Sequence, residues 1–288
     1  MLNSTVLDVA VGLVFTFLAM SLAVSSIVEA VASVLKWRST TLLQGIKDLL
    51  NDSEFTGLAR SMYNHAMVDP RDNGKAKTVE DVKYPPAYID PKQFADALID
   101  VMQIGGDSSD RIKATIDARV ADGQLNGLLK GIVDRSAGDL AKIRDQIADW
   151  FDNSMDRVSG VYKRKTQLWS LTIALILAGL LNISAVGVGR ALWQQPMLAR
   201  TIAPSANLKP VDALAELEKL DPPIGWTDSR FRSLKSSIGL EMVLGWLITG
   251  VATLFGAPFW FDALERIVRL KGSGPSPAEK RSGGGAAA

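Results

Sequence analysis

Trp150-Phe151-Asp152-Asn153-Ser154-Met155-Asp156-Arg157 begins the stretch that decides the fold, and Lys163-Arg164-Lys165 and an apolar run from Leu168 to Val188 complete it. The first part has the residue spacing of an amphipathic helix. The apolar run is long enough to cross a bilayer as a helix. One helix is therefore predicted to leave a water-soluble domain, pass through a basic collar and enter a membrane.

Composition excludes several kinds of chemistry. The 288 residues carry a formal net charge of +1, so no general attraction to nucleic acid is expected. The chain has no cysteine, which excludes disulfides, thiolate metal sites and cysteine nucleophiles. Any histidine-based site would have to be built around one ring, His65. No Walker, Rossmann, kinase or Gly-x-Ser-x-Gly motif is present, and we predict no catalytic residue, no cofactor and no metal.

Three apolar segments predict three transmembrane helices. Each holds about twenty uncharged residues, which as a helix span the hydrocarbon core of a bilayer. These uncharged cores are residues 9–28, 168–188 and 242–261. The first is expected to be a retained span rather than a signal peptide, because no basic segment precedes it and the run is too long. Gly256-Ala257-Pro258 predicts a bend in the third, and residues 263–271 a short amphipathic helix along the membrane surface.

The polar segment between the first two apolar runs is predicted to be a helical domain. Apolar residues recur at helical spacing over residues 41–50 and 54–68. Asp90-Pro91 marks the start of another helix, because aspartate caps a first turn and proline suits the first helical position. No alternating β pattern of useful length occurs. The predicted fold class is an all-α membrane protein, with three transmembrane helices and a cytoplasmic helical domain inserted between the first and second.

The predicted domains follow the chain in this order. They are a first transmembrane helix (1–36), the cytoplasmic helical domain (37–166), a second transmembrane helix (167–193), an extracytoplasmic loop domain with one short helix at 211–220 (194–235), a third transmembrane helix (236–262), and an amphipathic juxtamembrane piece with a disordered tail (263–288). Lysine and arginine near span ends favour the cytoplasm. Twelve of them flank the polar domain and tail, against five at the opposite ends. The N-terminus is therefore expected outside and the C-terminus in the cytoplasm.

Several stretches together resemble a known family. They include Tyr63-Asn64-His65, Pro85-Pro86-Ala87-Tyr88-Ile89, the run WFDNSMDRVSGVYKRKTQ from Trp150 to Gln167, Arg190-Ala191-Leu192-Trp193, and the run GAPFWFD from Gly256 to Asp262. In this order, and over most of the chain, they resemble a widespread family of uncharacterised bacterial integral membrane proteins. Members commonly show an aromatic residue where Val161 stands. The resemblance implies a multi-pass protein of the bacterial inner (cytoplasmic) membrane, and it carries no known activity.

Polar residues at the edges of the apolar runs are the candidate site residues. Lys163, Arg164, Lys165 and Trp260 are predicted to anchor the inner membrane edge, through lysine and arginine at anionic headgroups and an interfacial indole. Asn182 lies inside the second run and is predicted to make a polar contact between helices, because an amide in hydrocarbon seeks a hydrogen-bond partner.

Arg190 and Glu241 are predicted to form an ion pair at the outer interface, because they flank the same ends of the second and third runs. Reversing either charge is expected to lower the amount of protein in membranes, since one charge is then left facing another of its own sign. Reversing both is expected to restore that amount. Immunoblotting of membrane fractions measures the effect, and a double variant no better than either single one would contradict the pairing.

An acidic stripe marks the helix that begins the second run. Asp145, Asp149, Asp152 and Asp156 recur at steps of four, three and four residues and share one helical face. Such a face can bind a divalent cation. A solvated face is favoured, because Trp150 and its apolar neighbours already occupy the buried side.

Three hypotheses for the function follow. The leading one is a non-enzymatic scaffold or anchor that presents the cytoplasmic domain to a protein partner; a carrier is disfavoured, since no ionisable residue lies inside the spans. The first alternative is a channel formed by a homo-oligomer through small residues such as Gly245 and Gly250. The second is a membrane-tethered enzyme with a site around His65 and Tyr88. The lipid bilayer is an expected partner and nucleic acid is not.

Overall fold

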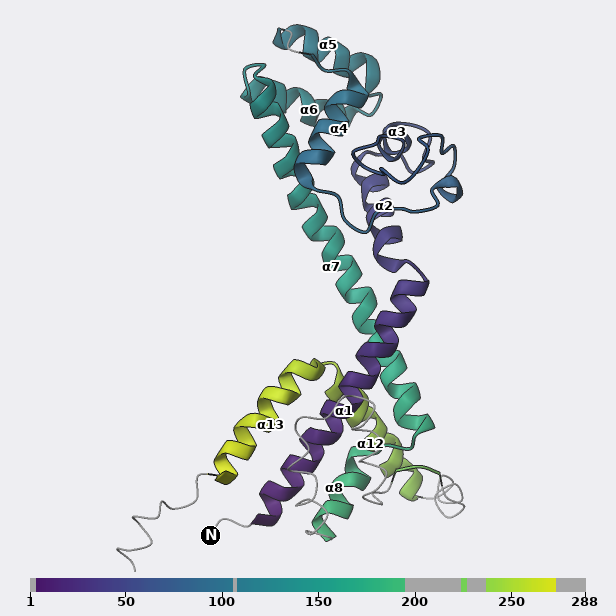
Figure 1. The fold of residues 1–288 in the computed structure, drawn as a ribbon, viewed down its shortest axis with the longest axis vertical. Coiled ribbons are helices and arrows are strands. Elements are labelled where there is room, and N and C mark those ends of the chain that lie inside the picture. Colours follow the sequence, from purple (N-terminus) through teal and green to yellow (C-terminus); the bar gives the residue numbers. More distant parts are fainter. Residues whose placement is uncertain (1–3, 106–107, 195–223, 227–236, 273–288) are drawn as a thin grey trace, which may run out of the picture. The chain divides into compact units, whose positions relative to one another are not determined.

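The computed structural model describes residues 4–105, 108–194, 224–226 and 237–272 (Figure 1). Within these ranges all regular structure is helical, which confirms the predicted all-α class. The predicted helix at 211–220 and most of the predicted loop domain lie outside the described residues. The elements are α1 (Ser4–Val34), α2 (Trp37–Leu49), α3 (Leu58–Tyr63), the 3-10 helix η1 (Val79–Asp81), α4 (Pro91–Met102), α5 (Ser109–Arg119), α6 (Gly123–Arg135), α7 (Leu140–Leu180), α8 (Ala185–Gln194), α12 (Ser237–Thr253) and α13 (Gly256–Gly272).

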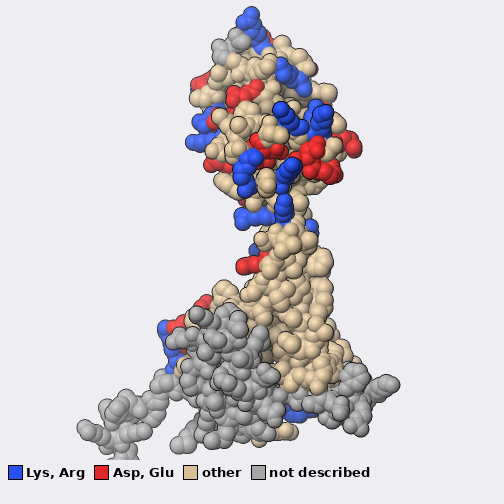
Figure 2. Space-filling view, turned by 45° about the vertical axis from the view of Figure 1, so that its right-hand side comes forward, with Lys and Arg blue, Asp and Glu red and all other residues tan. Residues whose placement is uncertain are grey.

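The chain divides into two compact units. The polar unit comprises residues 32–165, and the apolar unit comprises residues 1–31 together with 166–288. Helix α7 begins in the polar unit and ends in the apolar unit. The polar unit overlaps the predicted cytoplasmic domain at 37–166. Figure 2 shows acidic and basic side chains interspersed over the polar unit, whereas the described surface of the apolar unit is mostly uncharged on the face shown.

Helix α4 supplies a fully buried face to the core of the polar unit. The predicted start is correct, because the Asp90 carboxylate accepts hydrogen bonds from the backbone N–H groups of the first turn, at 2.9 and 3.2 Å. Phe94, Leu98 and Met102 follow at four-residue spacing and have no exposed surface. The Phe94 ring stacks on Phe151 of α7, with ring centroids 4.0 Å apart. This contact joins the first turn of α4 to the long helix.

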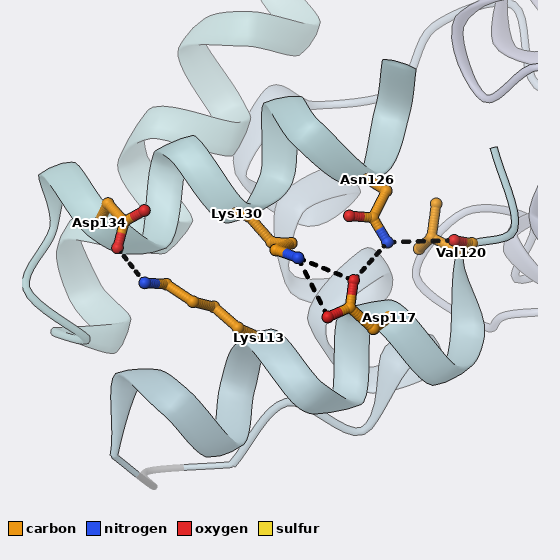
Figure 3. A network of polar contacts seen from close by, with 6 residues as sticks. All are labelled: Lys113, Asp117, Val120, Asn126, Lys130 and Asp134. Atoms are coloured by element: carbon orange, nitrogen blue, oxygen red, sulfur yellow. Dashed lines mark hydrogen bonds and ion pairs between the residues drawn. The ribbon is translucent and has the colours of Figure 1, made fainter. Parts of the chain in front are cut away.

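Helices α5 and α6 pack as a pair and are linked by a polar network on their surface (Figure 3). The Lys130 ammonium donates to both carboxylate oxygens of Asp117, at 2.9 and 3.0 Å, and Asn126 Nδ2 donates to one of them at 2.9 Å. Lys113 forms a further ion pair with Asp134. The bond from Lys130 is the main reason why the pKa of Asp117 lies below its ordinary value. Because all these groups reach water, the network contributes little stability.

The helix predicted over residues 54–68 is shorter in the structure, where α3 runs only from Leu58 to Tyr63. Asp52 explains the late start. Its carboxylate accepts hydrogen bonds from the backbone N–H groups of Thr56 and Gly57, both at 2.8 Å, and of two residues in the first turn of α3. A side chain that satisfies these donors takes the place of a preceding helical turn.

The second apolar run is broken, whereas the sequence predicted one helix through residues 168–188. Helix α7 ends at Leu180 and α8 begins at Ala185, with a bend of 49° between their axes. Asn182 lies in the break with φ of +48°, in the left-handed region that ends helices. A local backbone conformation therefore interrupts the helix that the apolar run predicted.

The third apolar run is also divided. Helix α12 ends at Thr253 and α13 begins at Gly256, and their axes differ by 96°. The corner adjoins the Gly256-Ala257-Pro258 sequence that predicted a bend, and Gly256 has φ of +81°, which favours glycine. The short surface helix predicted at 263–271 is the second half of α13. The predicted span 242–261 is therefore shared between two helices.

One helix among the described residues, Val6–Val34 within α1, is by itself long and apolar enough to cross a membrane. The number rises to three only if each bent pair, α7 with α8 and α12 with α13, counts as one span. The three spans predicted from the sequence thus correspond to one continuous helix and two bent pairs.

Candidate functional site

A groove in the polar unit is the candidate binding site. It encloses about 450 Å³ between α2, residues 87–91 and the part of α7 that belongs to this unit. Side chains from three separate parts of the sequence form its walls. They are Arg38, Thr41 and Leu42; Ala87, Tyr88, Ile89 and Pro91; and Phe151, Asp152, Met155, Asp156, Val158, Ser159 and Tyr162.

The floor of the groove is apolar and its walls are fixed by close helix packing. Leu42, Ile89 and Met155 come from the three wall segments and are buried or half-buried. Helices α2 and α7 approach closely at Gly45, where an added Cβ would lie 2.6 Å from Val158 Cγ2. Any larger side chain at this position would push the two helices apart. The glycine therefore sets the spacing of the helices beside the groove.

Three charged side chains from two helices line the groove. Arg38 belongs to α2, whereas Asp152 and Asp156 belong to α7. None of the three forms a hydrogen bond or ion pair with another described residue, and all three are exposed. An apolar floor with a guanidinium from α2 and two carboxylates from α7 suits a ligand that combines apolar side chains with a basic group.

The acidic stripe predicted on α7 is solvated, as expected, because all four aspartates are exposed. The structure also separates its members. Asp152 and Asp156 line the groove, whereas Asp145 and Asp149 do not. This difference could not be predicted from the sequence, because Arg38 and Tyr88, which also line the groove, lie more than 60 residues away along the chain.

The predicted membrane-edge anchors have two kinds of surroundings. Lys163, Arg164 and Lys165 are exposed on α7, and the Lys165 ammonium lies 5.3 Å from the ring centroid of Trp37 in a cation–π contact. The Trp260 indole is half-buried and packs against Phe17 of α1, with centroids 4.8 Å apart. Its N–H donates to the Ala252 carbonyl at 2.7 Å. Trp260 thus holds helices of the apolar unit together.

The predicted ion pair between Arg190 and Glu241 and the predicted interhelical contact of Asn182 are both present in the structure. Arg190 of α8 donates to a carboxylate oxygen of Glu241 of α12 at 2.7 Å, with both side chains about half exposed. Asn182 donates to the Gly225 carbonyl at 2.9 Å and accepts a hydrogen bond from Trp246 Nε1 of α12 at 3.2 Å. Both contacts link the α7–α8 pair to α12.

His65 and Tyr88, the residues of the enzyme hypothesis, do not share a pocket. The ring of His65 accepts a hydrogen bond from the Met67 backbone N–H at 3.4 Å, and its other nitrogen lies 3.6 Å from a carboxylate oxygen of Asp100. Tyr88 lines the groove, and His65 does not. In the described part of the chain no three His, Asp or Glu side chains are grouped as metal ligands.

A buried polar pair beside α3 was missed by sequence reasoning. The Tyr63 hydroxyl has no exposed surface and no hydrogen-bond partner, and one carboxylate oxygen of Asp69, a residue only 3 % exposed, also has none. Burial raises the pKa of Asp69, and burial together with the Asp69 charge raises the pKa of Tyr63. The side chain of Asp69 is therefore protonated more readily than that of an aspartate in water.

Replacing Asp69 by asparagine is expected to raise the thermal unfolding temperature of the polar unit at pH 7. The folded state holds the Asp69 proton more tightly than the unfolded state, so this group lowers stability as pH rises above its ordinary pKa of 3.8. The amide removes that penalty and the associated pH dependence. Asp81→Asn is the control of opposite sign, because backbone N–H groups lower the pKa of Asp81 and its ionised form stabilises the fold. Thermal melts between pH 4 and about 7 measure both; an unfolding temperature of Asp69→Asn below that of the parent would contradict the assignment.

No protein-family model matches the chain, and no curated protein and no solved structure shows significant similarity to it. The resemblance to bacterial integral membrane proteins therefore stays a prediction from the sequence.

Proposed function

We propose that this chain is a membrane-anchored scaffold whose polar unit binds a segment of a partner protein. The anchor is α1 together with the bent pair α7–α8, which cross the bilayer in opposite directions. Support comes from the apolar length of α1 and from α7, one continuous helix that belongs to both units.

The polar unit is proposed to lie in the cytoplasm of a bacterial cell, next to the inner membrane. Seven of the basic residues that predicted this orientation belong to that unit, and three of them form the exposed Lys163-Arg164-Lys165 collar on α7. Anionic lipid headgroups attract such a collar. The resemblance in sequence supports the same location.

The groove is the observation that carries the proposal. Its apolar floor and its charged side chains, Arg38 from α2 and Asp152 and Asp156 from α7, leave binding capacity that no described residue uses. The proposed occupant is a partner segment with an aliphatic side chain for the floor and a lysine or arginine for the two carboxylates. A volume of about 450 Å³ holds a few side chains, so the groove suits a short segment.

The two alternative functions have no comparable support. Gly245 and Gly250, proposed as contacts between subunits of a channel, lie against Ser184 and Leu175 of the same chain. The residues proposed for an enzyme site are not collected in one pocket. The scaffold is therefore the only function that we propose.

Site-specific photo-crosslinking in cells tests the groove. A photoreactive amino acid replaces Ser159, which lines the groove, and in a control it replaces Asn153, an exposed residue of the same helix outside it. The expected result is one protein adduct from position 159 and none from position 153. Adducts from both positions, or adducts only with lipid or with a second copy of the chain, would contradict a partner in the groove.

Charge reversal shows whether the two carboxylates select the partner. Asp152→Lys with Asp156→Lys is expected to reduce the position-159 adduct about tenfold or more, equivalent to ~1.4 kcal/mol of binding free energy. The matched control reverses Asp145 and Asp149, which belong to the same acidic stripe but not to the groove, and is expected to leave the adduct unchanged. Equal loss in both double variants would assign the effect to net charge and would refute recognition by the groove.

A further inference from the structure

The corner between α12 and α13 gives the third apolar run a shape that a membrane span does not have. Helix α12 has 17 residues, which correspond to about 25 Å, and the chain then turns through 96° into another 17-residue helix. A run that crosses the bilayer has to continue in one direction. The contacts that the corner and the far end of α13 make with α1 indicate the path of the chain after α12.

The corner lies beside the middle of α1. Ser21 Oγ donates to the Thr253 carbonyl at the end of α12, at 3.5 Å, and the Phe17 ring packs against Trp260 in the first turns of α13. Phe17 and Ser21 flank residue 20, the midpoint of the candidate span Val6–Val34. If α1 crosses the bilayer, the corner is therefore near its midplane.

From the corner, α13 runs back along the first half of α1, as Figure 1 shows. Its buried Leu264, with Ile267 and Val268, joins a cluster that contains Val11 and Val14 of α1. The second half of α1 packs elsewhere, against α7, through a cluster that includes no residue of α13. Eight residues from Trp260 to Val268 advance about 12 Å, the distance from Phe17 back to about Val9. The end of α13 thus approaches the N-terminal end of α1.

The order of residues along the two helices fits a path that enters hydrocarbon and leaves it again. Glu241, in the first turns of α12, is charged, but no residue from 242 to 261 is, and the exposed side chains there are predominantly large and apolar. Charges reappear from Asp262 onward, on the returning helix. On that helix Glu265 and Arg269 form an ion pair, and arginine side chains reach toward headgroups. The exposed apolar surface includes Leu244, Leu247, Ile248, Val251, Phe255 and Phe259.

We propose that α12 and α13 form a re-entrant hairpin that dips into one leaflet, contacts its acyl chains through this apolar surface, and returns to the side on which α1 begins. The C-terminus then lies on the same side of the membrane as the N-terminus. The sequence predicted the opposite side for the C-terminus, because counting charges assumed that the third run crosses. The proposal concerns only which membrane side the end of α13 shares with the start of α1. It therefore does not depend on which side is the cytoplasm.

The chain has no cysteine, so single-cysteine variants report the side of each position without further changes. Ser4→Cys marks the start of α1, Lys77→Cys the polar unit, and Arg269→Cys the end of α13, where the arginine side chain is 78 % exposed. Each variant is treated with a membrane-impermeant maleimide in sealed vesicles of both orientations, and its labelling after detergent gives the total. Ala288→Cys repeats the test for the tail.

In vesicles of the orientation in which the maleimide labels Ser4→Cys, it is expected to label Arg269→Cys and Ala288→Cys as well. In vesicles of the opposite orientation, in which Lys77→Cys is labelled, both variants are expected to be protected. Labelling of Arg269→Cys together with Lys77→Cys would show that the run crosses, and labelling from neither side would show that α13 does not return to the surface. Either result overturns the hairpin. The hairpin rests on the proposed function, in which α1 crosses the membrane. A separate result tests that crossing: it is refuted if Ser4→Cys and Lys77→Cys are labelled from the same side.

A spin label at Phe255→Cys tests the depth of the corner. The expected result is strong relaxation by oxygen, which concentrates in the bilayer centre, and weak relaxation by a water-soluble nickel chelate. Leu35→Cys is the matched control near the end of α1, where the chelate is expected to dominate. A corner as accessible to the chelate as the control would place α12–α13 on the membrane surface and refute the hairpin.

Discussion

Replacing Phe94 by alanine is expected to destabilise the polar unit by about 3–5 kcal/mol, enough to unfold it in a large fraction of molecules. The ring has no exposed surface, stacks on Phe151 at 4.0 Å and lies edge-on to Trp150 at 6.5 Å. Truncation leaves a cavity where α4 meets α7, and the surrounding helices cannot close it without losing contacts of their own.

Limited proteolysis of membranes measures this effect. Cleavage within residues 32–165 is expected to accelerate in Phe94→Ala, whereas α1 is expected to stay protected, because the two units have separate cores. Val161→Ala is the control, since this side chain is 50 % exposed and its loss removes little packing. Unchanged cleavage of Phe94→Ala would show that the aromatic stack does not support the unit.

Replacing Gly245 by alanine is expected to destabilise the apolar unit by about 1–3 kcal/mol, through overpacking between α12 and the start of α8. An added Cβ would overlap the Ser184 hydroxyl and lie 2.8 Å from Ser184 Cβ. The two helices would have to separate, which would also disturb the bond from the Ala185 backbone N–H to the Thr249 hydroxyl. Leucine at the same position is expected to have a larger effect.

Gly179→Ala is the matched control for Gly245→Ala. Its added Cβ has no described atom within 4 Å, and alanine is the better helix former, so stability is expected to stay equal or rise slightly. Thermal unfolding in detergent compares the two variants. The double variant Gly245→Ala with Ser184→Gly is expected to recover part of the loss, because it removes the overlapping atoms. A Gly245→Ala protein as stable as Gly179→Ala would refute the contact.

Local sequence determined the elements whose signals are local. The Asp90-Pro91 pair gave the start of α4 because both the cap and the proline act within one turn. The apolar spacing around Trp150 predicted the buried face of α7, and Asp145 and Asp149 predicted its solvent-exposed face. Helix periodicity is a property of neighbouring residues, so it can be recognised without knowing what the helix packs against.

Elements that depend on distant residues could not be predicted in this way. The helix expected over residues 54–68 lost its first turns to a carboxylate at Asp52. The helix expected through 168–188 is interrupted at Asn182, whose amide bonds to Gly225 and Trp246 more than 40 residues away. In the first case the Asp52 carboxylate accepts from backbone N–H groups that a preceding helical turn would have used. In the second, Trp226 Nε1 donates to the carbonyls of Gly179 and Leu180, which a continuous helix would have used. Periodicity does not reveal such competition.

The sequence by itself determined that the chain is helical, that long uncharged segments alternate with a charge-mixed one, and that ionisable residues avoid the centres of those segments. These properties follow from residue type and spacing alone. The tertiary structure decided that Arg38, Tyr88 and Asp152 surround one groove, and that α13 turns back along α1. Both depend on side chains meeting across large separations in sequence, and the direction taken after Gly256 is fixed by packing, because a glycine permits many directions and selects none.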